Sequence, residues 1–312
     1  MAFVKNFQYL GKNDAAIAGG KGASLGEMTQ AGIPVPPGFV VLASAFDQFV
    51  EKNQLGTKIE ALLNKINLKN INSVNQASDK IRGLILKLEF PPEMKGEIQK
   101  EFLNLKAKYV AVRSSATAED SSVASWAGEL ESYLNVDNKN LLTSVKKCWA
   151  SLFTPRAISY RFEKKLRKTK VAVAVVVQKM INSEISGICF TAHPVTKDRG
   201  QIVIEAGYGL GEAIVGGIIT PDTYIIDKKN FALKEKSISQ QGKMIVKGPS
   251  GNMNKSVPAS QQEKQKLGDK QIISLAKLCQ KIEKHYGIPQ DIEWAYEKNK
   301  MYIVQSRPIT TL

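Results

Sequence analysis

Two segments in the first half of the chain carry side chains suited to binding phosphate. The glycine-rich segment 19–22 contains Lys21, and its glycines would let backbone N–H groups approach an anion beside the lysine ammonium. Arg113 is followed by two serines at the end of an apolar run; a guanidinium can bind two phosphate oxygens at once, and hydroxyls add further donors. Gly128 precedes a predicted strand and would let a ligand approach the backbone. For each segment, a turn or an exposed strand end is the structural alternative.

A segment near the C-terminus combines candidate metal ligands with an arginine. Two alternating stretches joined by Glu-Lys-Asn-Lys predict a β-hairpin, and a turn centred on the asparagine places Glu293 opposite Gln305 and Asp291 opposite Arg307. The alternation also assigns Ile303 to this face. Carboxylate and amide oxygens are hard ligands for Mg²⁺ and arginine binds phosphate, so one face holds the parts of a nucleoside triphosphate site. The alternative is a solvent-exposed face with a cross-strand ion pair.

Other motifs argue against several kinds of chemistry. The segment 207–212 resembles a dinucleotide-binding fingerprint, but Glu212 stands at the third glycine position and no βαβ unit surrounds it. His193 precedes a proline with no acid or nucleophile beside it, and His285 ends a lysine-rich helix, so we expect both histidines to be structural or surface residues. Three widely spaced cysteines form no CxxC pair, which indicates a reduced protein without a zinc site.

The composition indicates a folded chain with an unusual charge. The 312 residues include 43% hydrophobic and 23% charged residues, which disfavours disorder, collagen-like repeats and coiled coil. The formal net charge of +15 is compatible with binding to nucleic acid, an anionic membrane surface or phosphorylated ligands, or with a surface that is only rich in lysine. The sequence shows no nucleic-acid-binding module, no signal-peptide pattern and no apolar run near the length of a membrane span. We therefore expect a cytoplasmic protein that binds neither nucleic acid nor a membrane.

Hydrophobic periodicity predicts a helix-rich first part and a strand-rich second part. Helices are expected at about 44–53, 57–66, 72–89, 92–106, 138–151, 155–166 and 260–285. Strands are expected near 39–42, 109–113, 131–136, 171–178, 186–191, 201–206, 223–227 and 243–247, followed by the C-terminal hairpin. The change in composition near 180–190 predicts two lobes of an α+β protein, residues 1–185 and 186–312.

Six sequence blocks, taken together and in order, resemble the ATP-binding domain of phosphoenolpyruvate synthase (pyruvate, water dikinase). The resemblance spans residues 1–312 and is far more specific than any single block. The blocks are Gly19–Met28, Ile33–Phe39, Val112–Asp120, Gly209–Glu212, Thr220–Asp222 and Gln305–Pro308. Rifampin phosphotransferase shares this domain and is the close alternative.

The resemblance implies an ATP-grasp fold, in which two lobes clamp ATP and Mg²⁺ between them. The implied site residues are Lys21, Arg113 and Arg307 at the phosphates, where they act in catalysis, Gln178 beside the adenine, Glu293 and Gln305 on Mg²⁺, and Gly128 and Ser132 in loops that cover the phosphates. Such a site works by positioning and charge neutralisation, as expected for phosphoryl transfer.

The full enzymes that the chain resembles are longer, and two of their domains have no counterpart in it. These are the swivelling domain, whose phosphate-accepting histidine follows Thr-Ser, and the domain that binds pyruvate and phosphoenolpyruvate. Neither His193 nor His285 has that context. The resemblance therefore implies that the β-phosphoryl group of ATP passes to a histidine on a separate domain or polypeptide, with AMP and phosphate as the other products. A non-catalytic ATP-sensing module is the alternative from another functional class.

Overall fold

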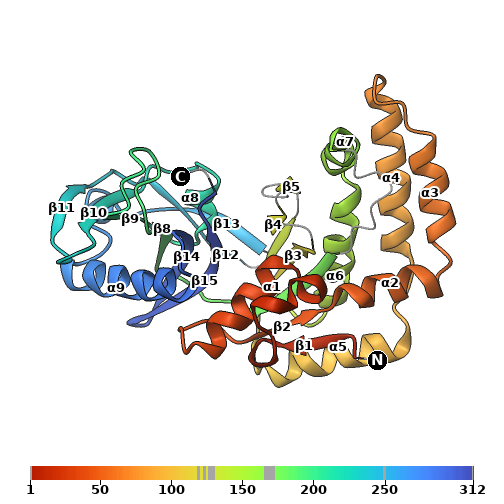
Figure 1. The fold of residues 1–312 in the computed structure, drawn as a ribbon, viewed down its shortest axis with the longest axis horizontal. Helices are drawn as coiled ribbons and strands as arrows, with labels where there is room; N and C mark the ends of the chain where they lie inside the picture. Colours follow the sequence, from red (N-terminus) through yellow and green to blue (C-terminus); the bar gives the residue numbers. More distant parts are fainter. Residues whose placement is uncertain are drawn as a thin grey trace. The chain divides into compact units, whose positions relative to one another are not determined.

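The computed structural model describes residues 2–117, 120–121, 124–125, 131–164, 173–248, 251–310 and 312. The chain forms two compact units: Met1–Glu27 with Pro37–Met180, and Met28–Pro36 with Ile181–Leu312. Each unit combines α-helices with an antiparallel β-sheet (Figure 1), which confirms the predicted mixture of helices and sheets. The lobes 1–185 and 186–312 stay a prediction, and Gly128 lies outside the described residues.

The first unit is built on a five-stranded sheet with the strand order β1-β2-β7-β3-β6. Every pair of neighbouring strands is antiparallel. The strands are β1 (Val4–Asn6), β2 (Gly38–Val41), β3 (Val110–Ala116), β6 (Ser132–Val136) and β7 (Val173–Lys179), and β4 (Asp120–Ser121) pairs separately with β5 (Ala124–Ser125). Because side chains alternate along a strand, β2, β3 and β7 each present one row of residues to either face.

Helices enclose one face of this sheet as a hydrophobic core. Phe39, Val112 and Val175 lie on this face, and they belong to the same buried cluster as Trp149. Residues from α2 to α7 complete the cluster. The helices of this unit are α1 (Ala15–Gln30), α2 (Ala43–Lys52), α3 (Gly56–Asn64), α4 (Ile71–Lys87), α5 (Pro92–Asn104), α6 (Leu141–Ala150) and α7 (Pro155–Glu163), with 3₁₀ turns η1 (Phe7–Tyr9), η2 (Lys12–Asp14) and η3 (Ser151–Phe153). The other face of the sheet is thereby left for α1 and for the candidate site.

The second unit is built on a six-stranded antiparallel sheet with the order β11-β10-β9-β8-β14-β15. Its strands are β8 (Ile185–Phe190), β9 (Gln201–Tyr208), β10 (Asp222–Asp227), β11 (Leu233–Ser237), β14 (Gln290–Glu297) and β15 (Lys300–Pro308). The remaining elements are α8 (Glu212–Val215), the ribbon β12 (Lys243–Gly248) with β13 (Gly251–Ser256), η4 (Ala259–Gln261) and α9 (Asp269–Tyr286). Helix α9 covers one face of the sheet and buries Cys189, Tyr224 and Trp294.

The hairpin β14–β15 has the two predicted cross-strand pairs, but it reaches them in another way. Lys298 and Asn299 both have positive φ, as in a tight two-residue turn, so the turn is centred half a residue earlier than predicted. A β-bulge between Glu293 and Trp294 then shifts the register by one residue. The assignment of Ile303 to the face of the candidate ligands is wrong, because Ile303 lies before the bulge, pairs with Trp294 and is fully buried.

Helix α9 begins nine residues later than the predicted start near 260. Residues 257–268 form a loop with one 3₁₀ turn, and the buried side chain of Lys266 holds this loop on the sheet through Asp222. The helix ends at Gly287, whose φ of 73° suits glycine. None of the described helices combines the length and the apolar character needed to cross a membrane.

Candidate functional site

The glycine-rich segment 19–22 packs directly on strand β3. Gly19 interrupts the helical geometry of α1 with φ 69° and ψ 168°, and a Cβ at this position would overlap the backbone carbonyl of Ser115. The backbone N–H of Gly22 donates to Ser115 Oγ at 3.3 Å, and a Cβ on Gly22 would lie 2.9 Å from Val40 Cγ2. Glycines here let α1, and with it Lys21, approach the sheet closely.

The other predicted residues of the first unit lie on this same face of the sheet. Arg113 is paired with Ser132 on β6 and with Val176 on β7. Gln178 follows two residues along β7, so its side chain points to the same face as that of Val176. Val176 also pairs with Val40 on β2, the residue that lies beside Gly22 of α1. The structure therefore places the predicted residues of this unit over one face of the sheet: Lys21, Arg113, Ser132 and Gln178.

The amide of Gln178 is buried and incompletely bonded. Its side chain is 2% exposed, and its Nε2 has no hydrogen-bond partner among the described residues. An unpaired buried donor costs about 1–3 kcal/mol. The amide therefore suits the acceptor of a bound molecule, such as a ring nitrogen of a nucleobase.

The two serines after Arg113 are committed within the protein. Ser114 Oγ donates to the carbonyl of Glu131 at 2.7 Å, and Ser115 Oγ accepts from the glycine-rich segment. Both side chains are buried. These contacts help to fix the positions of β3 and α1, and the expectation that the hydroxyls add phosphate donors stays a prediction.

Beneath this strand, Cys148 is a buried structural thiol. Burial raises the pKa of Cys148 to about 12, against its usual value near 9. Its Sγ lies 3.7 Å from the carbonyl oxygen of Val112. A thiol that stays protonated is a poor nucleophile, so cysteine chemistry has no place here.

In the second unit, the hairpin β14–β15 brings the candidate metal ligands and the arginine together. Glu293 pairs with Gln305 and Asp291 with Arg307, all on the face opposite α9. Asp291 Oδ2 accepts a hydrogen bond from Arg307 Nε at 2.9 Å and forms an ion pair with Nη2 of the same guanidinium at 2.8 Å. Burial raises the pKa of Asp291, and the neighbouring arginine opposes that shift. The ion pair holds the guanidinium beside Glu293 and Gln305.

A further carboxylate on this face, Glu205, was not found by the sequence analysis. Ile188 pairs with Glu205 on one side and with Glu293 on the other, so the two carboxylates belong to one row across the sheet. Burial, and secondarily the charge of Asp291, raise the pKa of Glu205. The alternation of side chains along β9 assigns Glu205 to one face of a strand. Only the strand pairing shows that this face also carries the hairpin residues.

The donor set fits Mg²⁺ held jointly with phosphate. The described residues contain no cluster of three or more His, Cys, Asp or Glu side chains that could hold a metal ion. Magnesium is commonly bound through one or two protein oxygens, with substrate phosphates and water completing its shell. Glu293 and Gln305 match that pattern. The described residues do not match the other kind of site, in which protein side chains alone surround the metal ion.

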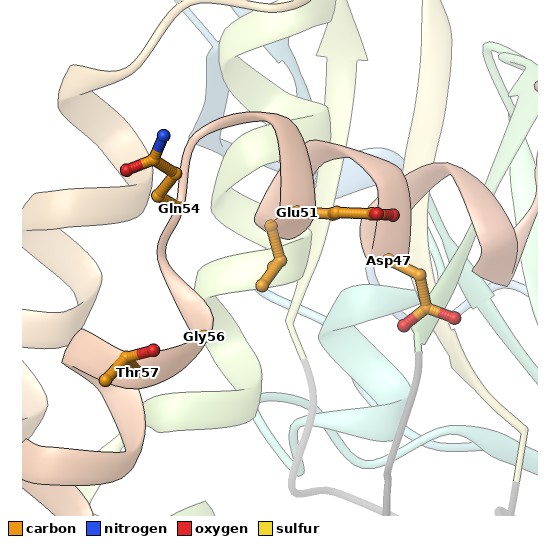
Figure 2. A pocket seen from close by; sticks show the side chains of 6 residues that line it. Asp47, Glu51, Gln54, Gly56 and Thr57 are labelled. Atoms are coloured by element: carbon orange, nitrogen blue, oxygen red, sulfur yellow. The ribbon is translucent and has the colours of Figure 1, made fainter.

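Two further features lie outside this set of residues. His193 serves a turn, as expected: its Nδ1 accepts from the backbone N–H groups of Val195 and Thr196, both at 3.2 Å. A pocket of about 520 Å³ lies where α2 leads into α3, and none of its lining residues is a predicted site residue (Figure 2). The lining residues are Asp47, Val50, Glu51, Gln54, Gly56 and Thr57.

Comparison with known proteins identifies the family. A family model described as pyruvate phosphate dikinase, AMP/ATP-binding domain, matches residues 15–312. The chain belongs to this family. Individual relatives agree with the family match: the phosphoenolpyruvate synthase of Pyrococcus furiosus is 45% identical over 99% of this chain. The rifampicin phosphotransferase of Bacillus cereus is 40% identical over 100% of it.

The pyruvate phosphate dikinase AMP/ATP-binding domain is only a part of these relatives. The chain spans 44% of the length of the Pyrococcus protein and 36% of the Bacillus protein. The expected resemblance to phosphoenolpyruvate synthase is confirmed, and so is the close relationship with rifampicin phosphotransferase. An ATP-binding domain of this family is therefore the established description of the chain.

Proposed function

We propose that this chain binds Mg-ATP in an ATP-grasp arrangement and passes a phosphoryl group to a histidine on another domain or polypeptide. The observation that carries the proposal is the register of β14–β15, which sets Glu293 beside Gln305 and Asp291 beside Arg307. Carboxylate and amide oxygens next to a guanidinium suit a metal-bound triphosphate. The family match to an AMP/ATP-binding domain supports the same ligand.

The residues assigned to the nucleotide lie on one sheet face within each unit. Lys21 and Arg113 bind phosphate oxygens, and Gly128 and Ser132 are assigned to cover them, although Ser132 lies on strand β6 and not in a loop as predicted. Gln178 binds the adenine through its unpartnered amide. Glu293 and Gln305 hold Mg²⁺. When bound, Mg²⁺ neutralises phosphate charge and orients the phosphate chain.

The residues of the chain would act on the transfer by position and charge. Arg307, held by Asp291, is aimed at the phosphates and stabilises the negative charge that spreads over the transferred group. No side chain of the chain is assigned as the acceptor, because neither His193 nor His285 follows Thr-Ser. The acceptor is proposed to be a histidine on a swivelling domain, which then serves a domain that binds pyruvate and phosphoenolpyruvate.

A second candidate differs only in the final acceptor. The similarity to rifampicin phosphotransferase favours an enzyme whose acceptor is the antibiotic rather than pyruvate. The two candidates share the ATP half-reaction, so the residues of this chain do the same work in both.

Calorimetric titration with Mg-ATP tests the binding part of the proposal. Glu293→Ala and Arg307→Ala should abolish measurable binding or transfer while the fold is retained. Glu297→Ala and Lys300→Ala are the matched controls, because they remove an acidic and a basic side chain from the turn end of the same hairpin. Both variants should bind Mg-ATP as the unmodified chain does. Unchanged affinity and transfer in both site variants would refute the assignment.

A labelling experiment separates an enzyme from an ATP sensor. ATP carrying label in its β-phosphoryl group is incubated with the chain and a separately supplied phosphohistidine domain. Label on that domain supports phosphoryl transfer, whereas binding of Mg-ATP without any transfer of label supports the sensor.

A further inference from the structure

The side chain of Gln241 acts as a strand partner for another part of the chain. It lies between β11 and β12 and is 1% exposed. Its Oε1 accepts from the backbone N–H of Tyr208 at 2.8 Å, and its Nε2 donates to the carbonyl of Tyr208 at 3.1 Å and to that of Lys243 at 3.0 Å. One amide thus satisfies both backbone groups of Tyr208, the last residue of β9.

Tyr208 leads into the glycine-rich segment 209–211, whose path is closely defined. Gly209 has φ 87°, and a Cβ there would overlap the carbonyl oxygen of Ile245 on β12. The carbonyl of Gly209 accepts from Ser186 Oγ at 2.6 Å, and Leu210 N–H donates to Ile245 at 2.8 Å. The segment is held between the β12–β13 ribbon and strand β8.

This segment borders the face that carries the candidate metal ligands. Ser186, which anchors Gly209, lies two residues before Ile188 on the same face of β8. Ile188 is the residue between Glu205 and Glu293 in the row across the sheet. A displacement of segment 209–211 would therefore alter the edge of the face beside Glu293.

The stretch that carries Gln241 is itself fixed from beneath. Asp222 and Lys266 form an ion pair of 2.8 Å in which both side chains are fully buried. Asp222 Oδ1 also accepts from Ser239 N–H at 3.0 Å, and Tyr224 Oη donates to Asp222 Oδ2 at 2.8 Å. Loss of one partner of a buried ion pair strongly destabilises a protein. The Asp222–Lys266 pair and its hydrogen bonds therefore fix the chain at Ser239, two residues before Gln241.

We infer that Gln241 is a positioning residue for the Glu293 face, acting through Tyr208 and the glycine-rich segment 209–211 without touching the nucleotide. This inference rests on the proposed function, because it assumes that the face binds Mg-ATP. It adds a residue that lies in none of the sequence blocks resembling the family.

The test is calorimetric titration of the whole chain with Mg-ATP, comparing Gln241→Met with Gln280→Met. Both substitutions preserve side-chain size; Gln280 Nε2 donates to the carbonyl of Lys228, away from the glycine-rich segment. For Gln241→Met we expect the dissociation constant to rise about tenfold with unchanged stoichiometry, since hydrogen bonds that orient the segment are lost. Gln280→Met should retain the affinity of the unmodified chain.

The binding stoichiometry separates positioning from stability. A purely structural role would lower the bound fraction and leave the dissociation constant unchanged, and that result would overturn the inference. Amide exchange at Leu210 should be faster in Gln241→Met and unchanged in Gln280→Met. If Gln241→Met fails to fold, the double variant Ser183→Ala/Ser186→Ala removes both hydroxyls that donate to the Gly209 carbonyl and should weaken Mg-ATP binding. Wild-type affinity in that variant would overturn the inference. Absence of Mg-ATP binding by the unmodified chain would instead refute the proposed function and this inference together.

Discussion

Gln178 offers the sharpest test at the residue scale, because its buried amide costs stability and has no evident internal use. Gln178→Leu replaces the amide with an apolar group of similar size. The free energy of unfolding should stay equal or rise by up to about 1 kcal/mol, since an unsatisfied donor is removed. Affinity for Mg-ATP should fall about tenfold, since a base acceptor loses its donor.

Ser78→Ala is the matched control for this variant. Ser78 on α4 is also fully buried, and its Oγ likewise has no hydrogen-bond partner among the described residues. Its replacement should leave Mg-ATP affinity unchanged in calorimetry and stability equal or higher in chemical denaturation. If Gln178→Leu binds nucleotide as well as Ser78→Ala does, Gln178 has no role at the base.

The sequence identified single residues whose type of side chain has few chemical uses. Lys21 and Arg113 were chosen as phosphate-binding side chains, and the structure brings their elements to one face of the sheet. Glu205 was missed, because a glutamate in an alternating strand is ordinary until its neighbouring strands are known. The internal partners of the serines after Arg113 could not be predicted for a similar reason, since these partners are distant in sequence.

At the scale of elements, the close approach of α1 to β3 depends on Gly19. An alanine there would combine a backbone conformation that is essentially restricted to glycine with an overlap against Ser115. Gly19→Ala should therefore lower the free energy of unfolding by about 3 kcal/mol or more. Gly96 in α5 is a matched control: a Cβ there meets nothing within 4 Å, and Gly96→Ala should stabilise the protein by about 0.5–1 kcal/mol. Equal denaturation midpoints for the two variants would contradict this account of the helix.

The positions of the elements were predictable where periodicity alone decides them. Helices α2 to α7 lie close to their predicted ranges, because each has a continuous apolar stripe against the core. Helix α9 was extended too far, since the loop before it is held by the buried pair Asp222–Lys266 rather than by a helical pattern. The predicted cross-strand pairs of the hairpin were correct, although neither the tight turn nor the bulge was predicted. The shift of the turn and the shift of register at the bulge compensate each other at these pairs. The assignment of Met28–Pro36 to the second unit needed tertiary contacts.

At the scale of the whole molecule, the net charge of +15 raises the question of whether the protein binds nucleic acid, because the chain has 44 basic residues and 29 acidic ones. Several lysines are neutralised internally, as in Lys228–Glu283 at 2.8 Å and Lys234–Asp227 at 2.9 Å. Only Lys21, Arg113 and Arg307 are assigned to phosphate. We therefore expect no retention on immobilised duplex DNA or single-stranded RNA at about 150 mM salt, where exposed charges are largely screened.

Salt dependence distinguishes a local triphosphate site from a polyanion-binding surface. A protein that neutralises many nucleic-acid phosphates loses about 10³–10⁵ in affinity between about 50 and 200 mM salt. With three basic residues and a metal ion at one triphosphate, Mg-ATP affinity should change by less than about tenfold over that range, as measured by calorimetry. A steep loss of nucleic-acid binding over the same range, starting from micromolar or tighter affinity, would show that the excess charge is organised for a polyanion. A shallow dependence for Mg-ATP with no nucleic-acid binding would leave most lysines as solvated surface, with three basic side chains at the nucleotide.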